Sequence, residues 1–460
     1  MEFPGFCSWL NRMETVQRKS AEERWAAAYA GLVGAWLGIA LLKFGNPVIL
    51  DRLVVPPADF FEFVFQPWPV HWGHVMLAGL AVGAVPLARF RVEVPRWILW
   101  LPLVWLGWQV AAGVRTVNAQ LSHEVLKHFV SCVAGFYLGI FVLSRARRTD
   151  WFQLAVLAAL AWVIWQGLEQ HFGGLEATRQ FVRTQPNWQQ LPAEYLKKLE
   201  SNRIFSTLVY PNALAGAMLL LLPMGMAGLW QLSARLSIVT RWTLVGILGL
   251  SGLGCLYWSG SKSGWLIALV MALVAFLQLK LGRAAKVWIV GTVLAVGLAG
   301  FFIKFAPYFQ RGATSVGARF DYWRAGVQIA RQNPIFGTGP GTFSVGYAKI
   351  KAPESEMTRL THNDYLEQAC DSGLVGFLSY TAFVLGSVGL LYRKVRTADW
   401  GWFTIWMGVC AWALQGLVEF GLYIPALAWP AFVFLGSLWG GAPAKMTPVR
   451  NGIDSRPAGR

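Results

Sequence analysis

Residues 208–232 read LVYPNALAGAMLLLLPMGMAGLWQL and contain no charged side chain. A helix crosses the hydrocarbon core of a bilayer with about 20 mostly apolar residues, so this stretch is long enough to span a membrane. The whole chain of 460 residues is 55% hydrophobic and only 14% charged, whereas a soluble protein carries roughly 25% charged residues. The sequence therefore predicts an all-α polytopic membrane protein whose main surroundings are the lipid bilayer.

Eleven further stretches meet the same criterion. The twelve predicted spans are 26–44, 73–90, 96–114, 125–143, 151–170, 208–232, 241–258, 263–280, 286–305, 373–392, 401–420 and 424–440. The first apolar run is as long as a full span, so we expect an uncleaved first helix and not a signal peptide. The chain shows neither an internal repeat nor a low-complexity linker. Residues 1–460 are therefore expected to form a single integral membrane domain.

The distribution of Lys and Arg over the connections between the spans is a test of this arrangement. The net charge is +17, but Lys and Arg fall in short clusters between apolar runs, which is typical of cytoplasmic loops and argues against nucleic-acid binding. If the N-terminus is cytoplasmic, each connection from an even to an odd span should be basic. These connections hold Arg89, Arg91, Arg96, Arg145, Arg147, Arg148, Arg235, Arg241, Lys280, Arg283, Lys286, Arg393, Lys394 and Arg396. The ends add Arg12, Arg18, Lys19, Arg24, Lys445, Arg450, Arg456 and Arg460. We predict that both termini are cytoplasmic.

Three long segments then lie on the outer side: 45–72, 171–207 and 306–372. The last contains an amphipathic pattern, because apolar residues recur at helical spacing until the pair Asn333-Pro334. The apolar positions are Val316, Phe320, Trp323, Val327 and Ala330. We expect this helix to lie on the membrane or to cap the bundle.

The same segment ends with Thr361-His362-Asn363-Asp364-Tyr365-Leu366. The Thr361-x-x-Asp364 spacing resembles a capping box, which predicts the start of a helix. A His in the first turn lies at the positive end of the helix dipole, which favours neutral imidazole. Neutral imidazole can accept a proton from a hydroxyl, so His362 is the first candidate for a catalytic residue. The alternative is a His that only caps or hydrogen-bonds the loop.

Lys262, Arg319 and Glu419 are further candidates. Lys262 stands among Ser and Gly in an outward turn, where small residues let backbone amides approach a phosphate and the Lys supplies charge. Arg319 begins the amphipathic helix, and Glu419 lies near the outer end of the eleventh span. The alternatives are a Lys that reaches the membrane surface, an Arg on a solvated face and an acid at the interface.

We find no metal or cofactor motif in the sequence. His71-x-x-His74 lacks a third ligand, and the five Cys are scattered without a Cys-x-x-Cys pair. The outward loops contain no Asp-x-Asp pair. The glycine run at 337–341 lacks the Gly-Lys-Ser/Thr ending and the flanking strand of a phosphate-binding loop, so we predict a turn.

Four stretches occur in a recognisable order: RFDYW (319–323), PIFGTGPGTF (334–343), HNDYLE (362–367) and GLVG (373–376). Two more extend the pattern, from Asn202 to Ala213 and from Glu419 to Ala426. In order and spacing they resemble the O-antigen ligase and polymerase family, from about Arg203 to Trp439. The resemblance is specific around His362.

This resemblance implies a bacterial inner-membrane protein of twelve helices, with a periplasmic catalytic loop (306–372) between the ninth and tenth spans. It also implies an inverting, metal-independent glycan transfer from an undecaprenyl-pyrophosphate carrier, with no cofactor. In ligases the acceptor is a sugar hydroxyl of the lipid A core, and in polymerases it is another lipid-linked glycan. The implied partners are the glycan donor, a hydroxyl acceptor and the bilayer, with no nucleic acid.

Carried over, His362 would activate or position the acceptor hydroxyl and Arg319 would bind the donor pyrophosphate. Lys262 stands where the family usually has Arg, which keeps the charge but loses the bidentate fork. Gln415 and Glu419 stand where many relatives have His and Asp. The predicted catalytic residues are His362, Arg319 and Lys262, and the predicted substrate-binding residues are Arg203, Asn212, Arg324, Asp364 and Glu419.

The sequence favours ligase-like transfer, including transfer to protein or to another non-core acceptor. A polymerase of the same family is the near alternative. A transporter is the alternative from a different class, with Glu419 and the polar loops forming a permeation path. Transporters often show inverted repeats and interrupted helices near the midplane, and neither is clear in the sequence.

Overall fold

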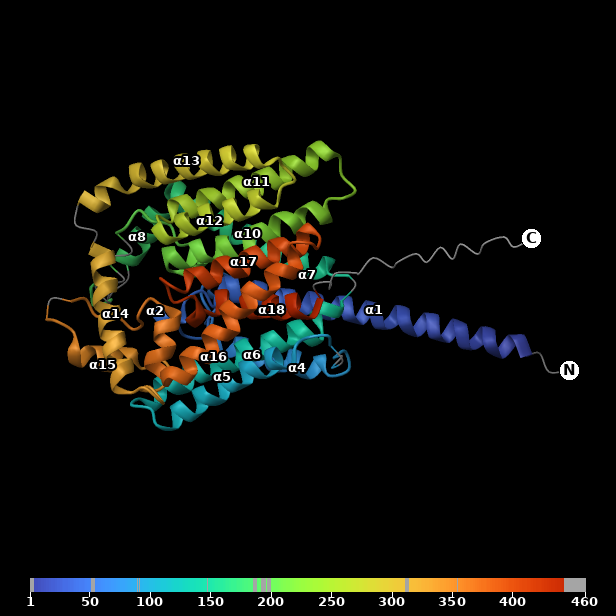
Figure 1. Cartoon of the computed structure of the whole chain (residues 1–460), viewed down its shortest axis with the longest axis horizontal. Helices are drawn as coiled ribbons and strands as arrows, with labels where there is room; N and C mark the ends of the chain where they lie inside the picture. The colour runs from blue at the N-terminus through green and yellow to red at the C-terminus, as the bar shows by residue number, and fades with distance from the viewer. Residues whose placement is uncertain are drawn as a thin grey trace, which may run out of the picture.

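The computed structural model describes residues 4–441 except 51–53, 89, 91, 147, 185–187, 192–195, 197–199, 311–313 and 354. Within this part of the chain the regular elements are helices, with no strand (Figure 1). Each of the twelve predicted spans falls on a helix. These are α1 (Pro4–Lys43), α4 (Val70–Ala84), α5 (Arg96–Val114), α6 (Ala119–Phe141), α7 (Asp150–Glu169), α10 (Pro211–Leu232), α11 (Ile238–Trp258), α12 (Lys262–Gln278), α13 (Arg283–Gln310), α16 (Asp364–Val395), α17 (Trp400–Gln415) and α18 (Pro425–Gly441).

Eight of the described helices are long and apolar enough to cross a membrane: α1, α5, α6, α7, α10, α11, α13 and α16. This confirms the multi-pass, all-helical class. The helices α4, α12, α17 and α18 have 15, 17, 16 and 17 residues. At 1.5 Å per residue they are about 25 Å long or less, against a hydrocarbon core of about 30 Å. Their assignment as spans stays a prediction.

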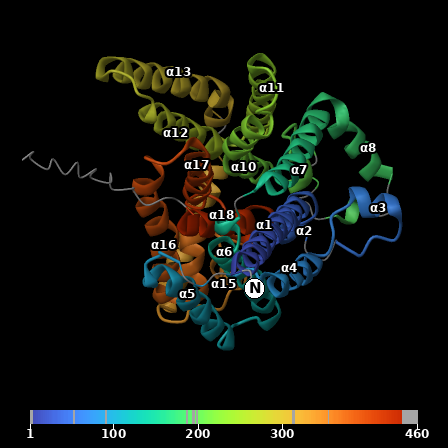
Figure 2. The ribbon, with the colours of Figure 1, turned by 90° about the vertical axis from the view of Figure 1, so that its right-hand side faces the viewer.

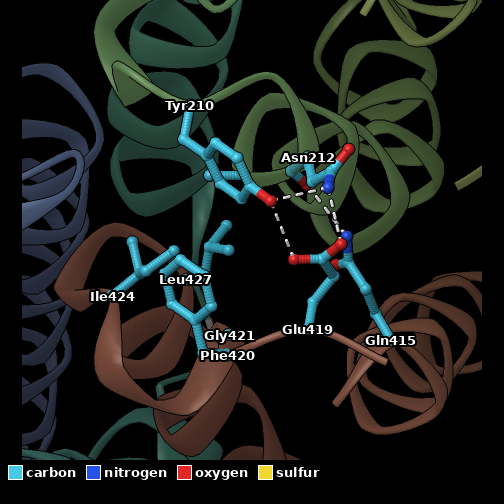
Figure 3. Close-up of a pocket in the computed structure, with 9 residues that line it drawn as sticks. Tyr210, Asn212, Gln415, Glu419, Phe420, Gly421, Ile424 and Leu427 are labelled. Atoms are coloured by element: carbon cyan, nitrogen blue, oxygen red, sulfur yellow. Dashed lines mark hydrogen bonds between the residues drawn. The ribbon is translucent and has the colours of Figure 1, made fainter. Parts of the chain in front are cut away.

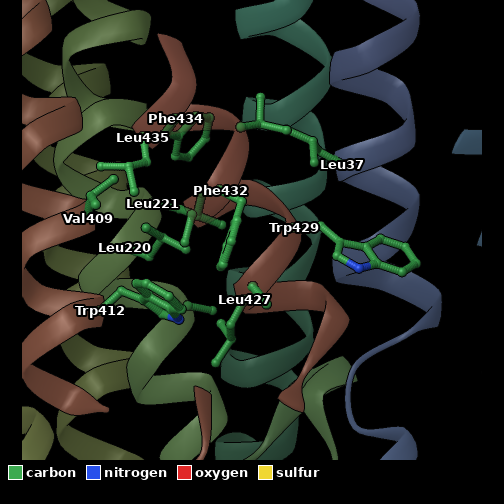
Figure 4. Close-up of a cluster of buried hydrophobic side chains, with 14 of the residues drawn as sticks. Leu37, Leu220, Leu221, Val409, Trp412, Leu427, Trp429, Phe432, Phe434 and Leu435 are labelled. Carbon is green, nitrogen blue, oxygen red and sulfur yellow. The ribbon is translucent and has the colours of Figure 1, made fainter. Parts of the chain in front are cut away.

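The centre of the bundle is α18, which is buried from Pro425 to Trp439 and contacts α1, α6, α10 and α17. Large side chains from three of these helices fill the core, among them Trp412, Leu220 and Phe432 (Figure 4). A Cβ added at Gly436 would lie 2.0 Å from the Phe136 carbonyl oxygen. The backbones of α6 and α18 therefore touch, as small residues permit between membrane helices.

Three helices, α11, α12 and α13, lie to one side of this core (Figure 2). Only 11% of the apolar window of α13 is buried. Its exposed side chains include Val287, Trp288 and Ile303. An apolar helix with so little cover is suited to face lipid.

The two ends of the bundle differ. Short helices gather at one end (Figure 1): α2 (Pro47–Leu50), α8 (Leu175–Thr184), α14 (Thr314–Gln332) and α15 (Phe343–Ile350), with α3 (Phe60–Phe65) in the loop that follows α2. The other end carries tight turns and basic residues. There Arg241 donates to the Trp230 carbonyl at 2.9 Å, and the Lys394 ammonium lies 5.1 Å from the Trp439 ring.

The predicted basic connections fall at this second end wherever the structure describes them. Arg89, Arg91, Arg147, Lys445, Arg450, Arg456 and Arg460 lie outside the described residues. The charge pattern of the described connections supports a cytoplasmic position for this end of the bundle. Which end faces the cytoplasm stays a prediction.

The amphipathic helix of the long loop exists as α14 and ends at Gln332, directly before Asn333-Pro334, as predicted. The predicted apolar face differs from the side of α14 that packs on the rest of the protein. Phe320 and Val327 are exposed, whereas Tyr322, Ala325 and Ile329 are buried against α15 and α16. The buried face contains a Tyr and an Ala, which weigh little in an apolar pattern.

The tenth predicted span (373–392) begins at a break in α16, which lies at Ser372 and Gly373. The helix itself begins earlier, at Asp364, where the stretch Thr361–Asp364 predicted a helix start. Hydropathy missed the first two turns because they are rich in polar residues. Glu367, Gln368 and Asp371 are nonetheless fully buried, because other helices surround them.

Candidate active site

Glu419 lies at the centre of a polar cluster at the end of the bundle that carries α14. It sits in the turn between α17 and α18, and its side chain is 4% exposed. Oε1 accepts a hydrogen bond from Asn212 Nδ2 at 2.5 Å and forms an ion pair with Arg319 Nη2. Oε2 lies 3.3 Å from both His362 Nδ1 and the Tyr210 hydroxyl. One carboxylate thus joins residues that are far apart in the sequence (Figure 3).

Arg203 joins the cluster through the start of α10. Its Nη2 donates to Asn212 Oδ1 at 2.7 Å, and its Nε donates to the Ser259 carbonyl at 2.6 Å. The second contact ties the cluster to the turn between α11 and α12. Lys262 is the first residue of α12 after this turn.

The predicted capping box was wrong, although a helix does begin here. The N-cap of α16 is Asn363, whose side chain accepts from the amides of Tyr365 and Leu366 at 3.1 and 3.0 Å. Thr361 instead donates its backbone N–H to Glu367 Oε2 at 2.6 Å. His362 therefore precedes the cap and does not lie in the first helical turn.

The backbone at His362 has φ +55°, in the left-handed region that residues with a Cβ rarely adopt. Such a conformation at a site residue is a reason to look for function. The imidazole is stacked with the Tyr322 ring, 5.7 Å away, and meets the Phe420 ring edge-on at 4.9 Å. These rings and Glu419 fix the orientation of the imidazole.

Asp364 lies behind the cluster. Its Oδ2 accepts from the Leu422 amide at 2.9 Å, and its backbone N–H donates to the Gly416 carbonyl at 2.7 Å. Both partners belong to the turn that carries Glu419. Asp364, predicted as a substrate-binding residue, therefore holds this turn in place in the structure.

The two remaining predicted residues, Lys262 and Arg324, do not contact Glu419. The Lys262 ammonium lies 3.7 Å from the Tyr308 ring centre. Arg324 has an 83% exposed side chain and lies 3.8 Å from Asp321. The structure therefore brings Arg203, Asn212, Arg319, His362 and Glu419 together, places Lys262 next to them and leaves Arg324 outside.

The charged side chains of the cluster shift one another's pKa values. Burial alone would raise the pKa of Glu419, but Arg319, His362 and Arg203 outweigh it and hold the pKa below its usual value. The Glu419 carboxylate in turn raises the pKa of Arg319, and burial lowers that of Arg203. Both guanidinium groups stay charged at neutral pH. Two arginines around one carboxylate leave the cluster with excess positive charge, which suits an anionic ligand.

A small hollow, with room for about one water molecule, adjoins Glu419. Its polar lining comes from Tyr210, Asn212 and Gln415, and its apolar lining includes Phe420 and Ile424 (Figure 3). The hollow is smaller than a typical small-molecule pocket of roughly 300–1,000 Å³. A sugar would need room beyond this space.

Tyr210 was not predicted as a site residue. It precedes Pro211, which opens α10, and Asn212 Nδ2 donates to its hydroxyl at 2.8 Å. The stretch Tyr210-Pro211-Asn212 was noted as part of a motif, and this was the available signal. Tyr322, against His362, was likewise visible only as part of RFDYW.

Residues 246–381 match the family model for O-antigen ligase. The resemblance drawn from the motifs is thereby confirmed over this segment. The match contains Lys262, Arg319, Arg324, His362 and Asp364, whereas Arg203, Asn212 and Glu419 lie outside it.

An uncharacterized protein of Haemophilus influenzae is 25% identical over 162 residues, which cover 30% of this chain and 41% of the relative. The similarity thus spans less than half of either protein. Its name assigns no activity.

Among the residues that the structure describes, no group of three His, Cys, Asp or Glu side chains could hold a metal ion.

Proposed function

We propose that the protein is a bacterial inner-membrane glycosyltransferase that moves a glycan from an undecaprenyl-pyrophosphate carrier to an acceptor hydroxyl, as an O-antigen ligase does. The match to this family over residues 246–381 and the eight candidate spans support the proposal. The observation that carries it is the shared carboxylate of Glu419, which contacts His362 and Arg319 at once.

The contact between Glu419 and His362 Nδ1 favours one tautomer. If Nδ1 carries the proton and donates it to Oε2, the lone pair lies on Nε2, where it can accept the proton of the acceptor hydroxyl. The acceptor oxygen then bonds to the anomeric carbon of the donor glycan. The bond from that carbon to the pyrophosphate breaks, and the carrier pyrophosphate leaves with the electron pair.

The leaving pyrophosphate needs positive charge, and the cluster supplies it. Arg319 and Arg203 are preorganised by their contacts with Glu419 and Asn212, and fixed cations stabilise charge that develops in a transition state. Arg319 has an 18% exposed side chain. A donor pyrophosphate would therefore share Arg319 with Glu419. Lys262 would add charge without a bidentate fork.

The proposed topology has twelve spans, both termini in the cytoplasm and the Glu419 cluster at the periplasmic face. The basic residues at the opposite end of the bundle support this orientation, because Lys and Arg are enriched in short cytoplasmic loops. Lipid-linked donors would then reach the cluster from the outer leaflet. Arg203, Asn212, Arg319 and Glu419 would bind the donor, with Asp364 positioning the turn of Glu419.

The test is an assay with the purified full chain in nanodiscs, an undecaprenyl-pyrophosphate oligosaccharide and a set of hydroxyl acceptors. We expect His362→Ala to lower the transfer rate at least about 100-fold, the usual contribution of a general base. The exposed His71 is a suitable control, and His71→Ala should transfer at the wild-type rate. Full activity in His362→Ala would refute the assigned role.

The acceptor in the same assay decides between the two activities of the family. Glycan on a lipid A core, a protein or another non-core acceptor indicates a ligase. Elongated lipid-linked glycan indicates a polymerase. Absence of any turnover by the wild type would reject the transferase proposal.

A further inference from the structure

The helix α3 (Phe60–Phe65) presents apolar side chains that the proposed function does not use. Its sequence is FFEFVF, and five of its six side chains are between 36% and 81% exposed. These five are Phe60, Phe61, Phe63, Val64 and Phe65. Figure 2 shows α3 at the rim of the molecule, outside α2 and α4. Single exposed apolar residues are common on proteins, but a contiguous group marks an interaction surface.

This surface belongs to a well-formed helix. Asp59 Oδ1 accepts a hydrogen bond from the Glu62 amide at 2.8 Å, and Glu62 Oε2 accepts one from the Ala58 amide at 2.7 Å. The two carboxylates thus bond the free amides at the start of α3, as in a capping box. The Phe61 and Phe65 rings, one turn apart, lie 4.7 Å from centre to centre. The helix therefore presents its rings in a fixed arrangement, with the acidic groups at its N-terminal end.

Lys43 closes the other end of α3. Its Nζ donates to three backbone carbonyls, those of Phe63, Val64 and Gln66, at 2.9, 2.5 and 3.0 Å. Trp68 Nε1 donates to the Phe63 carbonyl as well, at 2.8 Å. The last carbonyls of a helix have no partner within the helix, and on an aqueous surface water bonds them. Partners supplied by the protein itself are what a helix end needs where water is scarce.

The depth of α3 follows from the same contacts. Lys43 is the last residue of α1, which is one of the candidate spans. The Trp68 amide donates to the Lys43 carbonyl at 3.2 Å, shortly before α4 begins at Val70. The Trp68 and Trp72 rings lie 5.4 Å from centre to centre, and Trp is enriched where the hydrocarbon core of a bilayer meets the headgroups. The end of a span thus holds α3 at this depth.

We propose that α3 lies in the headgroup layer of the bilayer leaflet at this end of the bundle, with its phenylalanine side chains among the upper parts of the acyl chains. A helix in this position buries its apolar side about 5–10 Å into the boundary between headgroups and acyl chains. Lipid accounts for both observations, because it covers the exposed rings and leaves little water to bond the last carbonyls. This position requires neither a substrate nor the proposed reaction.

The accessibility of spin labels on the full chain in nanodiscs tests the position of α3. One nitroxide is attached to Phe60→Cys, Phe61→Cys or Phe65→Cys in a Cys7→Ser background. All three side chains are exposed, so the label displaces no core side chain. Oxygen, which concentrates in the bilayer, should relax each label more than a nickel chelate, which stays in water. The order should reverse at Val117→Cys, which is 54% exposed in the turn between α5 and α6.

Lys43→Met tests the hold on α3, because it keeps the length of the side chain and removes the group that bonds three carbonyls. In the Phe61→Cys background we expect a sharper spectrum, which reports a more mobile label. Lys127, in an exposed pair with Glu124, is the control, and Lys127→Met should leave the spectrum unchanged. An unchanged spectrum in Lys43→Met would overturn the role of Lys43.

Two accessibility results would overturn the membrane position. Stronger relaxation by the nickel chelate at all three positions of α3 would place the helix in water. Labels that neither reagent reaches would show that protein covers the helix, as a second copy of the chain could. Since the measurement needs no turnover, a failure of the proposed glycan transfer would leave the position of α3 standing.

Discussion

Glu419 is the single residue on which the cluster depends most, because its two oxygens serve different partners. Glu419→Gln keeps the size of the side chain but leaves Arg319 without a counterion in a site where the Glu419 side chain is 4% exposed. Removing one partner of such a pair costs about 3 kcal/mol. We expect a lower Tm in detergent and a loss of transfer. Glu124, in an exposed pair with Lys127, is the control, and Glu124→Gln should change stability by less than about 1 kcal/mol.

The effect of Glu419 should depend on pH in one direction. Its folded-state pKa lies below the usual value because Arg319, His362 and Arg203 outweigh burial. The stabilisation by the ionised group is therefore present at neutral pH and is lost as the pH falls through the carboxylate range. The difference in Tm between wild type and Glu419→Gln should stay constant from about pH 7 to about pH 5 and shrink as the pH falls below about 4.5. A difference that does not shrink in this acidic range would contradict the ion-pair role.

At this scale the sequence predicted much of the cluster, since Arg203, Asn212, Arg319, His362 and Glu419 were all singled out. Arg324 could have been excluded. It is five positions after Arg319, which rotates its side chain by about 140° around a helix, so both cannot face Glu419. Asp364 looked like a site residue because it adjoins His362. Its partners Leu422 and Gly416 lie far along the chain, and only the fold reveals them.

The element that positions His362 is α16, together with the glycine turn at 337–341 that packs on its break. Gly373 has φ +66°, and an added Cβ would lie 2.3 Å from the Ile335 carbonyl oxygen. The Asp371 carboxylate accepts hydrogen bonds from the Gly341 amide at 2.7 Å and from the Tyr423 hydroxyl at 2.8 Å. The predicted turn is therefore confirmed, and it is anchored to the helix that follows His362.

We expect Gly373→Ala to destabilise the protein by at least about 1–3 kcal/mol, since this backbone conformation is nearly exclusive to glycine and the added Cβ would overlap backbone. Gly386 is the control on the same helix, because an added Cβ there meets nothing within 4 Å. Gly386→Ala should keep or slightly raise the Tm, as Ala favours helix over Gly. Equal Tm values for the two variants would contradict the packing of the break.

Element boundaries show what hydropathy can and cannot predict. It located all twelve apolar helices, because lipid and protein interior both favour apolar side chains. It failed at the start of α16, where Glu367, Gln368 and Asp371 are buried by other helices. It also failed for the buried face of α14, where Tyr322 packs on Tyr347 at 5.6 Å between ring centres. Polar side chains that are buried through tertiary contacts carry no local signal.

At the scale of the whole molecule, the two ends of the helical bundle carry different sets of polar residues. One holds the Glu419 cluster, and the other holds most of the described basic connections. The proposed reaction requires the first end to face the periplasm, where the lipid-linked donor is exposed. The same charge asymmetry that directs insertion would therefore decide on which side of the membrane the chemistry occurs.

Single-cysteine labelling tests this orientation. Val117 is 54% exposed in the turn between α5 and α6, at the end with the cluster, and Thr397 is exposed between α16 and α17 at the opposite end. Cys132, Cys255, Cys370 and Cys410 are buried, so a Cys7→Ser variant should show little background labelling. A membrane-impermeant maleimide should label Val117→Cys in intact spheroplasts and Thr397→Cys only after the membrane is opened. The reverse pattern would put Glu419 and His362 in the cytoplasm, away from a periplasmic donor, and the proposed transfer would then fail for a reason that no substitution in the cluster could reveal.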